Sequence, residues 1–72
     1  MISREVYRVG ALSHWVSVLQ VDNNKGGYKF EVWEQIVEGN SIEEKFHGSY
    51  NVLKRATDKA QSVTNNNHTT EV

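Results

Sequence analysis

The chain has 72 residues, with eight basic and nine acidic side chains, a formal net charge of −1 and no cysteine. A chain of this length buries only about 60% of the surface that its unfolded form exposes, so we expect one domain with a thin core. The lack of cysteine excludes disulfides, thiol chemistry and cysteine-based zinc sites, which leaves dimerisation as the ordinary way to bury more apolar surface.

The N-terminal segment does not read as a targeting signal. It carries Arg4, Glu5 and Arg8 and has no uninterrupted apolar run, which argues against a secretory leader. No stretch approaches the roughly 18 consecutive apolar residues that a membrane span needs. Together with the absence of cysteine, these features predict a cytoplasmic protein.

The first twenty residues fit two structures. Apolar side chains recur there at helical spacing, and Ser3 is placed to cap such a helix. Gly10 and the density of valine and aromatic residues favour strands instead. We expect a strand over residues 4–9, a turn at 10–13 and a second strand containing Trp15.

A hairpin follows. Residues 16–21 are rich in β-branched side chains, and a cluster of Asp, Asn and Gly at 22–27 is typical of a turn. In residues 28–37, aromatic and aliphatic side chains alternate with polar ones, as in a strand with one buried face. This alternation directs Val32 toward the core and Trp33 away from it.

The rest of the chain predicts an edge strand, a helix and a tail. Residues 42–46 form a short charged strand, and Ser49 is placed to cap a helix of about 14 residues that ends at Val63. The polar residues 64–72 read as a disordered tail after a single domain at 1–63. The expected fold is α+β: a three- to four-stranded antiparallel β-meander with one C-terminal helix packed on one face.

No catalytic constellation, metal site or cofactor site is evident, so we expect a non-enzymatic interaction module. It would be an adaptor or inhibitor of the kind that mobile elements encode, and its partner would be another protein or a second copy. The binding surface would be the outer sheet face together with an acidic hairpin. The candidate residues are Trp15, Glu31, Trp33, Glu34, Glu38, Glu43 and Glu44.

Two other functions remain open. The first is a nucleic-acid-binding module, with Lys54, Arg55 and Lys59 of the helix as contacts. The order of elements resembles small DNA-binding sheet modules such as integrase arm-binding domains, but the three glutamates of residues 28–38 would repel phosphates. The second is a ribonuclease-type toxin that uses His47 with a nearby glutamate as an acid–base pair.

The C-terminal residues supply a minor hypothesis. Thr70-Glu71-Val72 matches, at two positions, the carboxyl-terminal pattern that PDZ domains bind by strand addition.

Overall fold

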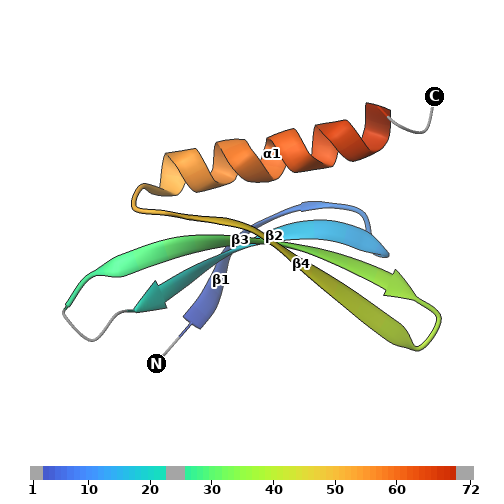
Figure 1. The fold of residues 1–72 in the computed structure, drawn as a ribbon, viewed down its shortest axis with the longest axis horizontal. Coiled ribbons are helices and arrows are strands. Elements are labelled where there is room, and N and C mark those ends of the chain that lie inside the picture. Colours follow the sequence, from blue (N-terminus) through green and yellow to red (C-terminus); the bar gives the residue numbers. More distant parts are fainter. Residues whose placement is uncertain (1–2, 23–25, 70–72) are drawn as a thin grey trace.

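A computed structural model of the chain describes residues 3–22 and 26–69. In these residues four strands form one antiparallel sheet in the order β1-β2-β3-β4, and a helix lies across one face of the sheet (Figure 1). The elements are β1 (Ser3–Gly10), β2 (His14–Asp22), β3 (Tyr28–Glu38), β4 (Ser41–Tyr50) and α1 (Leu53–Thr69). The predicted α+β meander with one C-terminal helix is confirmed.

The first twenty residues form strands, as expected. Tyr7 lies opposite Val18 in the β1–β2 ladder, and Gly10 lies opposite Trp15. Gly10 has a φ of +129°, and a Cβ there would lie 2.7 Å from the carbonyl oxygen of His14. The positive φ and this close approach both require glycine at the turn between β1 and β2.

Alternation along β3 separates the two faces of the sheet. Val32 is fully buried against α1. Trp33 is directed to the opposite face, where it lies between Ser17 of β2 and Phe46 of β4. The prediction that Trp33 faces away from the helix is confirmed. We call the face without the helix the outer face.

The core lies between the sheet and α1 and is made of small side chains. Its buried apolar residues are Val16, Val18, Val32, Ala56, Ala60 and Val63. The two alanines have no exposed surface, so α1 lies close against the sheet. Larger side chains, such as those of Tyr7 and Phe30, pack at the margins and are only partly buried.

Both predicted ends of the helix were wrong. Ser49 belongs to β4, opposite Glu31, so it does not cap the helix, which begins four residues later at Leu53. At the other end α1 continues past Val63 to Thr69, so residues 64–69 are helical rather than part of a tail. The Thr64 hydroxyl donates to the carbonyl of Ala60 at 3.0 Å. The helical hydrogen-bond pattern therefore continues without further burial of apolar side chains.

The proposed motif at Thr70-Glu71-Val72 lies outside the described residues. Within the described part of the chain, no helix is long and apolar enough to cross a membrane.

Candidate functional site

The outer face is the first candidate surface. Alternation places Trp15, Leu19, Trp33 and Phe46 on it, and α1 lies on the opposite side of the sheet (Figure 1). No element of the described residues covers this face. Phe46 is 54% exposed, and Ile42 beyond it is 62% exposed. An open sheet face with this aromatic content is unusual for a chain that acts alone.

One half of the outer face is held by a charged cluster on β1 and β2. The Arg8 guanidinium lies 4.9 Å from the centre of the Trp15 ring, a cation–π distance. Arg8 donates to both carboxylate oxygens of Glu5, at 2.8 and 3.1 Å, and the Ser17 hydroxyl donates to Glu5 at 2.6 Å. The hydrogen bonds from Arg8 and Ser17 lower the pKa of Glu5 below its ordinary value. Glu5 therefore holds the Arg8 guanidinium in place over the Trp15 ring.

The other half of the outer face is aromatic. The rings of Trp33 and Phe46 lie 5.1 Å apart at 56°, a tilted contact. The Trp33 indole nitrogen donates to Glu31 at 3.0 Å. On the same face, the Gln35 amide donates to Glu44 at 3.2 Å. Both predicted tryptophans and two of the five predicted glutamates are therefore brought together on one surface.

The remaining glutamates lie elsewhere. Glu38 and Glu43 are exposed at the end of the sheet near the β3–β4 turn, where Glu43 pairs with Lys45 at 3.5 Å. Glu34 is on the helix side and only 5% exposed. The structure therefore divides the acidic hairpin between the two faces, and Glu34 is not available to a partner.

Glu34 is the centre of a cluster that the sequence did not reveal. One carboxylate oxygen accepts a hydrogen bond from His47 Nε2 at 2.8 Å, and the other contacts His14 Nε2. Because an ionised carboxylate only accepts hydrogen bonds, each imidazole carries its hydrogen on Nε2 when Glu34 is charged. A bulge in the β3–β4 ladder lies beside this cluster, with Gly48 at a φ of +148°.

The cluster joins three strands. His14 begins β2, Glu34 lies in β3 and His47 lies in β4, so the two histidines approach the carboxylate from both sides. Each imidazole nitrogen is directed at a different carboxylate oxygen rather than at a shared point. Among the residues that the structure describes, no group of three histidine or acidic side chains is arranged to hold a metal ion.

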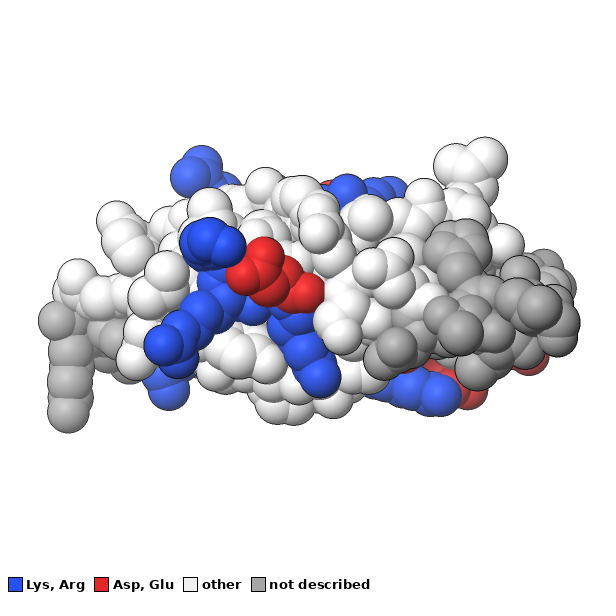
Figure 2. All heavy atoms as spheres, turned by 90° about the horizontal axis from the view of Figure 1, so that it is seen from above, with Lys and Arg blue, Asp and Glu red and all other residues white. Residues whose placement is uncertain are grey.

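The predicted basic helix is only partly basic. Lys and Arg side chains gather over the first half of α1 around an acidic residue (Figure 2). Lys54 pairs with Asp58 at 3.2 Å, while Arg55 is exposed and Lys59 is half-buried. Asp58 therefore offsets part of the positive charge that a phosphate backbone would meet.

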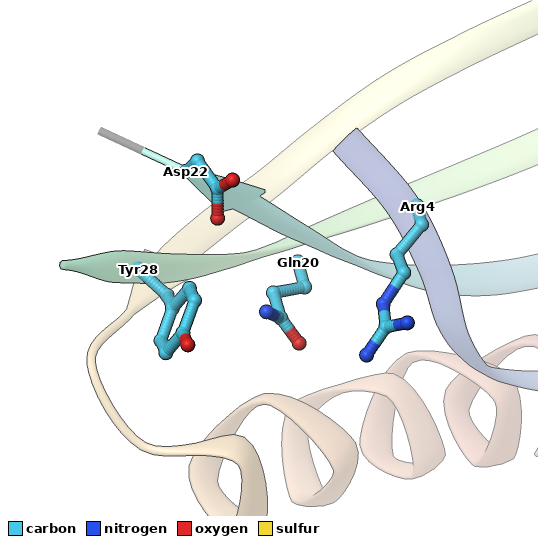
Figure 3. Close-up of a pocket in the computed structure, with 4 residues that line it drawn as sticks. All are labelled: Arg4, Gln20, Asp22 and Tyr28. Carbon is cyan, nitrogen blue, oxygen red and sulfur yellow. The ribbon is translucent and has the colours of Figure 1, made fainter. Parts of the chain in front are cut away.

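A shallow pocket of about 240 Å³ lies on the helix side, lined by Arg4, Gln20, Asp22 and Tyr28. Figure 3 shows Arg4, Gln20 and Tyr28 pointing from three neighbouring strands toward α1. Sequence patterns do not reveal this pocket, because it depends on the register of β1 against β2. Its side chains are polar and half-buried or exposed, so it resembles an open gap at the sheet margin more than a preformed ligand site.

Comparisons with known proteins assign no relationship. No protein-family model, no curated protein and no solved structure matches this chain.

Proposed function

We propose that this chain is a small protein-interaction module that binds through its outer face. The observation that carries the proposal is an uncovered sheet face bearing Trp15, Trp33 and Phe46. Tryptophan is among the residues most often found as binding hot spots. The charges of Glu31 and Glu44 flank the aromatic side chains and supply polar contacts of the kind found at interface rims.

The proposal includes an adaptor or inhibitor role in the cytoplasm. The lack of cysteine supports this location, since proteins in reducing compartments rarely depend on disulfides. Of the acidic side chains first considered, Glu31 and Glu44 belong to the proposed surface. Glu34 has an internal role, and Glu38 and Glu43 lie at the end of the hairpin.

A matched pair of variants tests the surface. Phe46→Lys changes an aromatic side chain that is 54% exposed on the outer face, and Tyr28→Lys changes one that is 57% exposed on the helix side. Tagged chains carrying each change would be compared with the original by affinity purification and mass spectrometry. We expect at least one partner to be lost with Phe46→Lys and kept with Tyr28→Lys. A partner set that neither change alters, or that Tyr28→Lys alone alters, would contradict the proposal.

One observation favours a second function, cleavage of RNA by His47 with a glutamate as its acid–base partner. His47 is 25% exposed, and its ring is oriented by a hydrogen bond to the buried carboxylate of Glu34. An oriented imidazole can serve as a general acid or base. Incubation of the purified chain with a fluorogenic RNA tests this function, with His47→Asn as the variant. Absence of cleavage by the original chain would end this candidate.

A further inference from the structure

We propose that the partner bound by the outer face is a second copy of this chain, so that two sheets pack face to face in a symmetric dimer. This inference rests on the proposed function and names its partner. Three features of the single chain support it: a core of small side chains, an excess of accessible surface and an elongated shape.

The core of one chain is small for its length. The largest side chains that are fully buried are valines and one serine, and no aromatic side chain in the described residues is buried. On the outer face Trp15, Leu19 and Trp33 are only half-buried and Phe46 is exposed, so they contribute less to folding than they would if fully buried. A second sheet placed over them would bury them and give each chain a second core.

The surface area agrees with this reading. The chain exposes 5293 Å². A compact monomer of 8.2 kDa exposes about 4,500 Å². The surplus is therefore roughly 800 Å², similar to the area that each partner buries in a standard interface.

The shape also fits one half of a larger unit. The chain measures 44 × 27 × 15 Å, and its radius of gyration is 12.8 Å. A compact domain of this length has a radius of gyration of about 11 Å. Two twisted sheets pack with their mean strand directions within about 30° of each other, so a second sheet on the outer face would thicken the molecule along the direction in which α1 lies over the sheet (Figure 1). The helices would then lie on the outside of a four-layer dimer.

Charge on the outer face allows two identical surfaces to meet. In a two-fold interface each patch contacts its own copy, so an unbalanced charge would repel itself. Here Glu5 and Arg8 neutralise each other on β1, at one margin of the sheet. Glu44 lies at the opposite margin on β4, and Glu31 lies on β3, where its carboxylate accepts the hydrogen bond from the Trp33 indole. The aromatic side chains of the face therefore lie among polar groups that a second sheet can meet with hydrogen bonds.

The test is the mass of the full chain in solution. Light scattering after size exclusion should give about 16 kDa, twice the chain mass, as expected for a two-fold dimer. Loading from about 5 µM to about 500 µM covers the range in which a micromolar dimer dissociates. Phe46→Lys should weaken the dimer by at least about 30-fold, the loss expected at an interface hot spot. Tyr28→Lys should leave the dimer unchanged, and circular dichroism should show that both variants fold.

The outcomes separate the dimer from the proposed function. A monomer at every concentration overturns the dimer, and so does a dimer that Phe46→Lys does not weaken. If the chain is monomeric but loses a different protein partner with Phe46→Lys, the outer face is still a binding surface and only its occupant was misassigned. If the chain is monomeric and no partner depends on Phe46, both proposals fail.

Discussion

The two faces of the sheet differ in the size and the burial of their side chains. On the helix side, small side chains such as Val18 and Ala60 pack closely and have no exposed surface, and the buried carboxylate of Glu34 is hydrogen-bonded. On the outer face, the half-buried ring of Trp33 lies beside the exposed ring of Phe46. The carboxylates there accept hydrogen bonds from neighbouring side chains at the surface. The largest apolar side chains therefore lie on the face where a single chain buries them least. Pairs of matched substitutions test this difference.

The largest loss of stability is expected from a change in the packed interface between α1 and the sheet. Ala60→Leu inserts three carbons where there is no space, and overpacking of this kind costs about 3 kcal/mol of unfolding free energy. Ser62→Leu adds a similar volume on the exposed side of the same helix and should change stability by less than about 0.5 kcal/mol. Urea unfolding at one fixed protein concentration measures both. Equal losses of unfolding free energy for the two changes would show that the interface between α1 and the sheet is not tightly packed.

A smaller effect on stability is expected when a single hydrogen bond to a carboxylate is removed, and the loss should differ between the two faces. His47→Ala removes a donor from buried Glu34 and should cost about 2 kcal/mol, as for a hydrogen bond to a buried charged group. Gln35→Ala removes the donor to exposed Glu44, where water replaces it, and should cost less than about 0.5 kcal/mol. Thermal or urea unfolding at neutral pH would rank them. The reverse order would mean that Glu34 is better hydrated than its burial indicates.

The smallest effect concerns pH and the outer face. The pKa of Glu5 is lowered in the folded chain by its hydrogen bonds from Arg8 and Ser17. Its contribution to stability is therefore complete above the ordinary pKa of 4.5 and is lost as the pH falls through the lower folded value. Because the side chain is 35% exposed, solvent screening should keep this contribution below about 1 kcal/mol.

The measurement is unfolding at several pH values between neutral and acid, for the original chain and for Glu5→Gln. The difference between them should shrink below pH 4.5. Glu38→Gln, at an exposed position on the same sheet, is the control and should not reproduce this change. A difference that is constant across the pH range would remove the titration of Glu5 as its cause.

Strand alternation made much of this fold readable from the sequence. The face occupied by Trp33, the turn at Gly10 and the edge position of β4 all follow from patterns two to four residues long. The helix ends were wrong for a local reason. Ser49 follows a glycine and precedes an amphipathic stretch, yet pairing of β4 with β3 continues to Tyr50 and delays the helix.

The Glu34 cluster was beyond local patterns. Its members come from three strands, and the contacts depend on the register of His14 near Ile36 and on a bulge beside His47, neither of which a single sequence specifies. One signal was present: Glu34 stands two positions after Val32 and therefore shares its buried face. A charged residue at an inward position should have prompted a search for its hydrogen-bond donors.

The separation of aromatic residues between the two faces has an optical consequence. Both tryptophans of the chain, Trp15 and Trp33, lie on the outer face, whereas the three tyrosines, Tyr7, Tyr28 and Tyr50, lie on the helix side. Light that excites tryptophan alone therefore reports only on the outer face, without any added label. The emission of the unmodified protein is a built-in probe of whatever comes to cover that surface.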